Sequence, residues 1–196
     1  LRSRLMLIAA NGHDPAAVLN QAVALGGLQD ARDPAAVITW RLDLTQASGG
    51  RTRGPLPWLP GIPTQLLDNP DWKTYLSARY SLTRKLGQEV HAGARTADAN
   101  PGWAEHLPGL DLGLVADIQL WRAAHHIPDT DLEPTGPARS TPAETRHQRH
   151  LDRQLETAQA GIREWLPKIT EAAPEVAGDP RLPVLAARLA NLHNKH

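Results

Sequence analysis

The chain has 196 residues, and its 21 basic and 21 acidic side chains cancel to a formal net charge of zero, which argues against bulk electrostatic binding to nucleic acid or anionic membrane. Cysteine is absent, which excludes disulfides, thiolate metal sites and thiol nucleophiles. The longest apolar run, Leu5–Ala10, is far shorter than the roughly 20 residues of a membrane-spanning helix, so we expect no membrane insertion.

Prolines mark the starts of the predicted helices. They number 17 of 196 residues, well above the usual share of about 5%. Six of them follow an Asp, Asn or Thr and precede an apolar-periodic stretch: Asp14-Pro15, Asp33-Pro34, Asn69-Pro70, Asn100-Pro101, Thr141-Pro142 and Asp179-Pro180. In such a pair the polar side chain caps free N–H groups while proline occupies the first helical position. No segment alternates with period two, so we predict an all-α fold.

The predicted helices follow these signals along the chain. They cover residues 2–10, 15–25, 34–42, 70–92, 101–106, 110–125, 142–165 and 181–192, with a short turn at 64–68. We expect a single helical accessory domain over 1–196, made of short N-terminal helices (1–44), a Pro/Gly-rich loop (45–63) and a main bundle (64–196). Since the chain begins at Leu1 and shows no cleavable signal peptide, we expect a cytoplasmic piece of a longer protein.

The loop between residues 45 and 63 ends in an extended apolar strap. Residues 55–63 carry Leu56, Trp58, Leu59 and Ile62 between prolines. Proline lowers the entropy lost when such a segment docks, so we expect the strap to lie against a core.

The last long helix has the clearest apolar pattern. Its apolar residues recur at steps of three and four: Leu151, Leu155, Ala158, Ile162, Trp165 and Ile169. A helix from Pro142 to Leu166 is about 37 Å long and needs a long partner. We predict antiparallel packing on the helix over 70–92, and a bundle with two long antiparallel helices. The residues expected on the buried side of that partner are Trp72, Leu76, Leu86 and Val90. Four tryptophans on apolar faces are expected in the core: Trp40, Trp72, Trp121 and Trp165.

Nine histidines raise the question of a metal centre. His147 and His150 stand three residues apart on the last long helix, but a zinc site needs three or four convergent ligands with supporting hydrogen bonds. We interpret this pair as part of a solvated face, and His125 as a packed core histidine. A metal-dependent hydrolase built on the histidines is the third of three functional alternatives.

Motifs of the common enzyme classes do not occur. The sequence has no G-x-S-x-G elbow, no G-x-x-x-x-G-K-[ST] phosphate loop and no G-x-G-x-x-G dinucleotide motif. We therefore expect no catalytic residue, no cofactor and no metal in this chain.

Surface residues remain as candidates for binding a partner. Acidic residues interrupt the arginines along the last long helix, which favours a solvated face over a DNA site. On the strap, Trp58 is not needed for a helix face, and tryptophan and arginine are the types most often found at interface hot spots. The predicted interaction residues are Trp58, Pro60, Arg139, Arg146, Arg149 and Arg153.

Several segments, taken in order, resemble one protein family. They are R-D-P-A-A-V at 32–37, W-R-L-D at 40–43, G-P-L-P-W-L-P-G-I-P at 54–63, Y-L-S-A-R at 75–79, L-W-R-A-A-H at 120–125, P-D-T-D at 128–131 and P-T-G-P at 134–137. This order resembles the region that follows the helicase in actinobacterial conjugative relaxases of the MobF class. Those are plasmid-transfer proteins with an N-terminal relaxase and a central RecD-like helicase. The resemblance covers about Arg2 to Leu155.

What the resemblance implies is a role without catalysis. In that family the nicking tyrosine, the metal-binding histidines and the Walker motifs lie upstream, and none has a match here. The implied role is a C-terminal accessory module that docks relaxosome or coupling proteins of the type IV secretion machinery. The rival is a domain that contacts single-stranded DNA weakly and assists the helicase. Zero net charge favours the protein partner.

Overall fold

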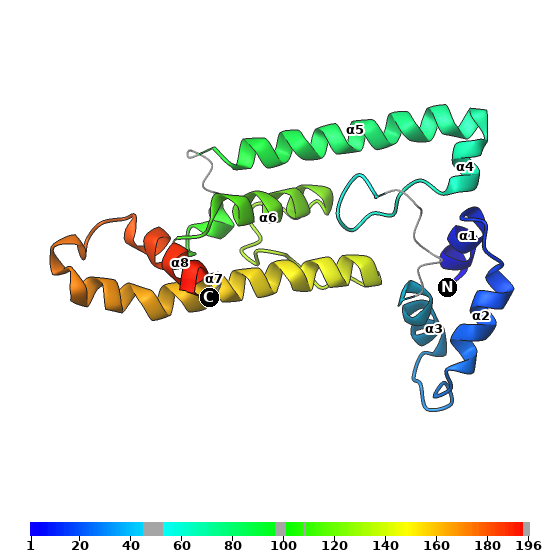
Figure 1. Ribbon diagram of the computed structural model, residues 1–196, viewed down its shortest axis with the longest axis horizontal. Helices are drawn as coiled ribbons and strands as arrows, with labels where there is room; N and C mark the ends of the chain where they lie inside the picture. Colours follow the sequence, from blue (N-terminus) through cyan, green and yellow to red (C-terminus); the bar gives the residue numbers. More distant parts are fainter. Residues whose placement is uncertain (45–52, 97–100, 108, 194–196) are drawn as a thin grey trace. The chain divides into compact units, whose positions relative to one another are not determined.

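The structure is a computed structural model that describes residues 1–44, 53–96, 101–107 and 109–193. Its described residues form eight α-helices and no β-strand, which confirms the predicted all-α class (Figure 1). They divide into two compact units. Unit 1 is Leu1–Leu86 with Ser140–Glu144, and unit 2 is Gly87–Arg139 with Thr145–His196. The single domain expected from the sequence stays a prediction.

The helices begin within two residues of their predicted starts. In chain order they are α1 (Arg2–Ala10), α2 (Pro15–Ala24), α3 (Pro34–Leu44), α4 (Thr64–Asp68), α5 (Pro70–Ala94), α6 (Leu112–Ala124), α7 (Pro142–Ala172) and α8 (Leu182–His193). The predicted turn at 64–68 is the short helix α4, and the helix expected over 101–106 is a 3₁₀ turn, Gly102–Ala104. Helix α7 continues through Pro167 and ends later than predicted.

Polar side chains cap these helices as the Asx-Pro pairs predict. Asp14, Asp33 and Asn69 each accept a hydrogen bond from a backbone N–H in the first turn of the following helix, at 2.9 to 3.0 Å. At the start of α7 the Thr141 hydroxyl donates to the Glu144 carboxylate at 2.6 Å. Each of the three bonds from a backbone N–H satisfies a free donor and stabilises its helix by about 1 kcal/mol, whereas the Thr141–Glu144 bond joins two side chains. The pair at 100–101 begins outside the described residues.

In unit 1, helices α1, α2 and α3 pack around a small apolar core. Its buried residues are Ile8, Ala22 and Leu42, with Leu5, Val18 and Ile38 packed against them. Arg41 joins α3 to the C-terminal end of α2, because its two terminal nitrogens donate to the carbonyl oxygens of Ala22 and Gly26 at 2.9 and 2.6 Å. Carbonyls at a helix end lack intrahelical partners, so this guanidinium takes the place of a C-cap.

The strap also belongs to unit 1, and it is described from Arg53 onward; residues 45–52 of the predicted loop lie outside the described residues. Arg53 forms an antiparallel bridge with Pro60, and the Tyr80 hydroxyl on α5 donates to the Arg53 carbonyl at 3.0 Å. Leu56 and Trp58 are buried, which confirms that the strap lies against a core.

Gly54→Ala is expected to open the strap. A Cβ at this position would lie 1.8 Å from the carbonyl oxygen of Leu59, so the backbone must move and the Arg53–Pro60 bridge must break. We expect a red shift in tryptophan fluorescence, because Trp58 becomes exposed to water. We also expect faster tryptic cleavage after Arg53, because its bridge to Pro60 is lost. Gly178→Ala is the control, since no atom lies within 4 Å of its added Cβ. An unchanged spectrum and cleavage rate for Gly54→Ala would contradict the described strap.

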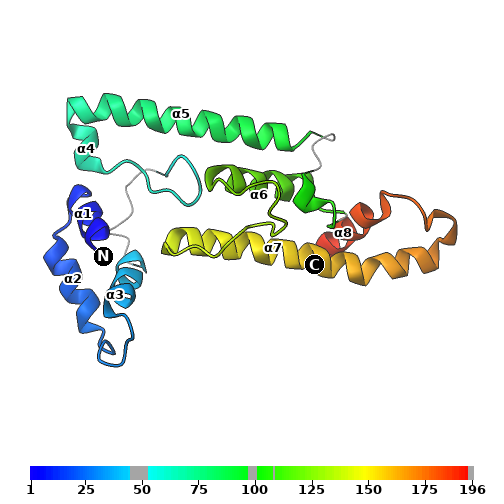
Figure 2. The same ribbon diagram turned by 180° about the vertical axis from the view of Figure 1, so that it is seen from behind.

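In unit 2, α6 lies beside α7 and runs antiparallel to it in both ribbon views (Figures 1 and 2). Helix α8 packs on the later part of α7, where a Cβ added to Gly161 would lie 2.5 Å from the Cβ of Ala190. Leu151 and Leu155 of the predicted seam are buried. The prediction that this seam packs on the helix over 70–92 stays a prediction, because most of that helix belongs to unit 1. An apolar seam fixes which face is buried, and it leaves open which helix covers it.

A connector, residues 127–139, joins α6 to α7 and is fastened by a buried arginine. Arg122 on α6 is only 2% exposed. One terminal nitrogen donates to the carbonyl oxygens of Glu133 and Pro134 at 2.7 and 3.2 Å, and the other donates to those of Pro128 and Asp131 at 2.8 Å each. Burial lowers the pKa of the Arg122 guanidinium, and the charges of two connector aspartates oppose that shift.

Two more side chains hold the second half of the connector. The Trp121 indole N–H donates to the carbonyl oxygen of Thr135 at 2.9 Å. The buried Gln148 side chain on α7 donates to the carbonyl of Gly136 at 3.0 Å and accepts from the backbone N–H of Arg139 at 3.0 Å. The W-R pair of α6 and the P-D-T-D and P-T-G-P segments therefore form one hydrogen-bonded unit.

Candidate interaction surfaces

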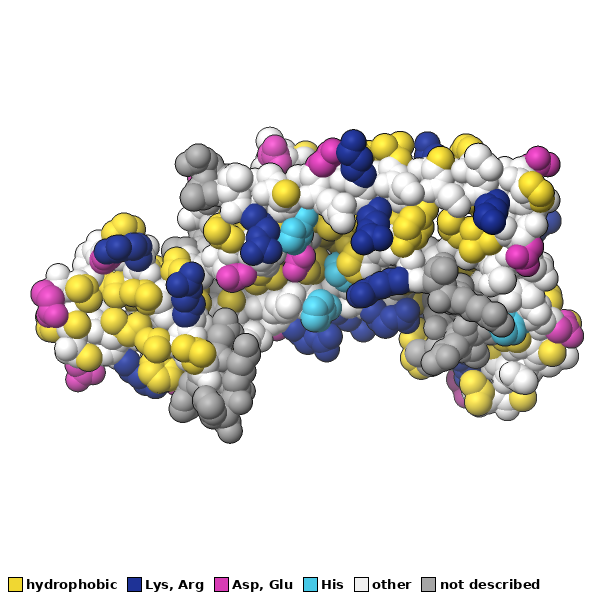
Figure 3. Space-filling view, turned by 45° about the horizontal axis from the view of Figure 1, so that its top comes forward, with side chains coloured by type: hydrophobic (Ala, Val, Ile, Leu, Met, Phe, Trp, Pro, Cys, Tyr) yellow, Lys and Arg dark blue, Asp and Glu magenta, His cyan; other side chains and the backbone are white. Residues whose placement is uncertain are grey.

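Helix α5 carries an exposed apolar stripe in unit 1. We define the α5 stripe as Trp72, Tyr75, Leu82 and Leu86, which recur on one side of the helix at helical spacing. Each of the four is between 49% and 55% exposed. The rings of Trp72 and Tyr75 meet edge to face, with centroids 6.4 Å apart. In Figure 3, α5 runs along the top, and hydrophobic side chains lie there among basic and acidic ones.

The α5 stripe overturns part of the predicted core. Trp72, Leu86 and Val90 were expected on a buried side, yet all three are exposed. The packed side of α5 is its neighbour around the helix, where Gly87 and Ala94 are buried. Trp40 on α3 was also expected in the core and is 54% exposed, because α3 directs Leu42 into the core of unit 1 instead.

Of the two strap residues predicted to bind a partner, one is exposed and the other is buried. Pro60 is exposed, whereas Trp58 is 5% exposed, so the interpretation of Trp58 as a surface residue was wrong. The physical reason is alternation: Leu56 and Trp58 turn inward while Pro57 and Leu59 between them turn outward. Trp58 therefore contributes to packing.

Arg139 differs from the other three candidate arginines because its side chain is half-buried. Its guanidinium carbon lies 5.9 Å from the centre of the Trp121 ring, and the side chain is half-buried. Its backbone carbonyl accepts from the Thr145 hydroxyl at 2.8 Å. These contacts give Arg139 a structural role at the end of the connector.

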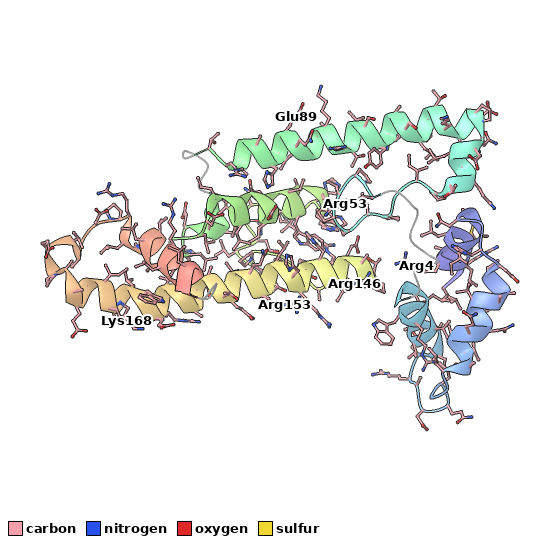
Figure 4. The ribbon with its side chains drawn as sticks, viewed as in Figure 1. Arg4, Arg53, Glu89, Arg146, Arg153 and Lys168 are labelled. Carbon is pink, nitrogen blue, oxygen red and sulfur yellow. The ribbon has the colours of Figure 1, made fainter. Side chains whose placement is uncertain are left out.

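Arg146, Arg149 and Arg153 form an exposed row on α7, which we call the arginine row (two of its members are labelled in Figure 4). They lie on the side of the helix opposite Leu151 and Leu155. The acidic neighbours expected to interrupt the row are turned to other partners. Glu144 accepts from Thr141, and Asp152 accepts from the Thr135 hydroxyl at 2.7 Å. Only Glu156 of the three predicted acids is exposed.

Histidines of α6 and α7 gather around the buried Trp121 in unit 2. The His125 ring centroid lies 4.0 Å from that of Trp121, and the His147 ring lies 5.5 Å from it on the α7 side. His150 is 6.3 Å from His147 and exposed. The solvated face predicted for this pair is therefore correct for His150 and wrong for His147, which is half-buried against the indole. The packed His125 agrees with its prediction.

Acidification is expected to weaken unit 2 through His147. Burial lowers the pKa of His147, the charges of His150 and His125 lower it further, and Asp117 opposes them. A lowered pKa means that the unfolded chain binds more protons, so the free energy of unfolding decreases as pH falls below the ordinary histidine value of about 6.5. His147→Gln should make the urea midpoint less dependent on pH between about 7.5 and 5.5. An equally steep dependence in the variant would assign the effect elsewhere.

A polar groove of about 430 Å³ opens between the start of α6 and the middle of α7. Its lining includes Asp111, Asp117, His150 and Arg153. The Asp111 carboxylate is already used, because it caps α6 by accepting from the N–H of Gly113 at 2.8 Å. Asp117 lies 3.1 Å from the Nε2 atom of His91 on α5. The groove thus mixes both signs of charge, with its carboxylates directed to neighbours in the chain.

Two further observations cover residues 1–44, 53–96, 101–107 and 109–193. In this part of the chain, no three His, Cys, Asp or Glu side chains are placed together so as to hold a metal ion. None of the helices described there is both long enough and apolar enough to cross a membrane.

Comparison with known proteins adds no assignment. No family model, no curated protein and no solved structure matches the chain.

Proposed function

We propose that this chain is a non-catalytic protein-interaction module, the C-terminal accessory region of a conjugative relaxase–helicase of the MobF class. In this proposal it works in the cytoplasm during plasmid DNA transfer and docks a relaxosome component or a coupling protein of the type IV secretion machinery. The family part of the proposal rests on the ordered segments of the sequence, from R-D-P-A-A-V to P-T-G-P.

The α5 stripe is the observation that supports docking. Trp72 and Tyr75 are about half-exposed on adjacent positions of one helix face, with Leu82 and Leu86 continuing it. Large aromatic side chains bury most of the area at protein interfaces and supply many of the hot spots. An apolar helix face of this kind fits the groove or helix face of a protein partner.

Binding to purified relaxosome and coupling proteins of the same transfer system tests this function. We expect the double variant Trp72→Ala/Leu86→Glu to bind its partner at least about tenfold more weakly, because loss of one hot spot costs 2 kcal/mol or more. The matched control is Leu185→Glu, on an α8 leucine that is also about half-exposed. Equal affinity of the double variant and the parent would exclude the α5 stripe as the docking surface.

Contact with single-stranded DNA is the second candidate function, and the arginine row favours it. Its three guanidinium groups follow one face of α7, with Glu144 and Asp152 engaged elsewhere. Since the chain has zero net charge, we expect micromolar or weaker binding of a labelled oligothymidine, falling steeply between about 50 and 200 mM salt. Arg149→Glu should weaken it further. Nanomolar, salt-resistant binding would place DNA contact ahead of protein docking.

A further inference from the structure

One basic side chain interrupts the α5 stripe. Arg79 is exposed and stands between Tyr75 and Leu82 on the same side of α5. Its backbone carbonyl accepts from the Thr83 hydroxyl at 2.9 Å. In the described part of the chain its guanidinium has no ion pair or hydrogen bond, so its five donors are available to a partner in the middle of an apolar face.

The positive charge of α5 indicates that a partner covering Arg79 is negatively charged. The helix carries four basic residues against two acidic ones: Lys73, Arg79, Arg84 and Lys85 against Asp71 and Glu89. A partner that covers the stripe desolvates Arg79, and burial of an unpaired cation is unfavourable. A carboxylate on the partner offsets that cost and accepts a bidentate pair of hydrogen bonds from the guanidinium.

A second copy of this chain does not supply that carboxylate. Two copies related by a two-fold axis present the same patch to each other. Arg79 is close to the midpoint of the stripe, so parallel pairing sets it against its own equivalent, and antiparallel pairing sets it within about one helical turn of it. Both arrangements bring two cations together across an apolar seam, which is destabilising.

A membrane surface fits less well than a protein. Helices that lie on anionic lipid carry Lys and Arg over their polar face. The side of α5 away from the stripe does carry the exposed Lys73 and Arg84, but Arg79 stands within the apolar stripe itself, where insertion among acyl chains would bury its charge.

We propose that the occupant of the α5 stripe is an acidic amphipathic helix, with an apolar seam for the four stripe residues and an Asp or Glu opposite Arg79. This inference rests on the proposed docking function. From Trp72 to Leu86 the stripe is about 21 Å long, which matches about four turns of a partner helix. The central ion pair sets the register of the two helices, as a polar residue does in a coiled-coil seam.

A displayed library of helices tests the charge of the partner without knowledge of its identity. Each library helix has about 20 residues, a fixed Leu/Ala seam, and Glu, Lys or Gln drawn at random at the central flanking positions. The library is sorted against the full 196-residue chain and against its Arg79→Glu variant. Arg79→Gln is the matched control, since it removes the charge alone.

Enrichment of Glu at one central position against the parent, replaced by Lys against Arg79→Glu, is the expected result. A selected helix should lose about tenfold in affinity for Arg79→Gln and more for Arg79→Glu. Selected helices without charge preference, still lost with Leu86→Glu, would overturn the acidic partner and leave the docking function standing. Binders that ignore Leu86→Glu would overturn both. Self-association of the parent chain, or binding to anionic vesicles, that is abolished by Leu86→Glu would replace the acidic helix with that occupant.

Discussion

Arg122→Ala is expected to lower the free energy of unfolding of unit 2 by at least about 3 kcal/mol. The substitution removes donors from four connector carbonyls at once, and each unsatisfied buried polar group costs about 1–3 kcal/mol. Part of this cost is relieved because the connector is close to solvent. Typical domains are stable by only about 5–15 kcal/mol, so the loss should be visible as a lower urea midpoint.

Two further variants give this prediction its controls. Arg122→Lys keeps a positive charge but has no planar fork to bridge four carbonyls, so most of the loss should remain. Arg188→Ala removes an exposed arginine of α8 in the same unit and should leave the midpoint unchanged. Full stability of Arg122→Lys would mean that charge, and not the hydrogen-bond geometry, fastens the connector.

Leu151→Asp and Leu86→Asp are expected to have opposite consequences. Leu151 on α7 is 1% exposed, so its replacement by a carboxylate buries an unpaired charge and should abolish the cooperative thermal transition of unit 2. Leu86 on α5 is 51% exposed, so the same substitution should leave the melting temperature within a few degrees of the parent. Differential scanning calorimetry of the two variants makes the comparison.

The result for Leu86→Asp also bears on the proposed function. A surface that is exposed to solvent in the free chain tolerates an added carboxylate, whereas a surface buried by the chain itself does not. If Leu86→Asp unfolds the chain as Leu151→Asp does, the α5 stripe is part of the core in solution. The stripe is then not available to a partner.

Helix starts were predictable because local chemistry fixes them. A small polar residue followed by proline caps a helix in the same way wherever it occurs, and Asp14, Asp33 and Asn69 do so here. Tertiary packing was harder to predict from the sequence. Trp121 and Trp72 both lie on apolar helix faces in the sequence, yet one is buried and the other is half-exposed. Periodicity shows that a face is apolar, and only the position of the other elements decides whether it is covered.

For the candidate interaction surfaces too, local patterns were predictable from the sequence and packing was not. The arginine row was predictable from helical spacing, since Arg146, Arg149 and Arg153 are all exposed. The α5 stripe was missed because two of its residues, Trp72 and Leu86, were assigned to a buried side, whereas both are about half-exposed. The W-R pair of α6 entered the sequence analysis only as part of the family resemblance, with no role predicted for Arg122. Four carbonyls grasped by Arg122 can be found only when the backbone of the connector is known.

The hydrogen bonds of Arg122 to the connector backbone determine which sequence changes the connector tolerates. The guanidinium binds main-chain oxygens, so the side chains at positions 131 and 133 can vary without loss of any bond to it. The spacing of those oxygens along the chain cannot vary, because one residue more or fewer would carry them out of reach. Among related sequences, the connector should therefore drift in composition while keeping a constant length, and insertions should accumulate elsewhere.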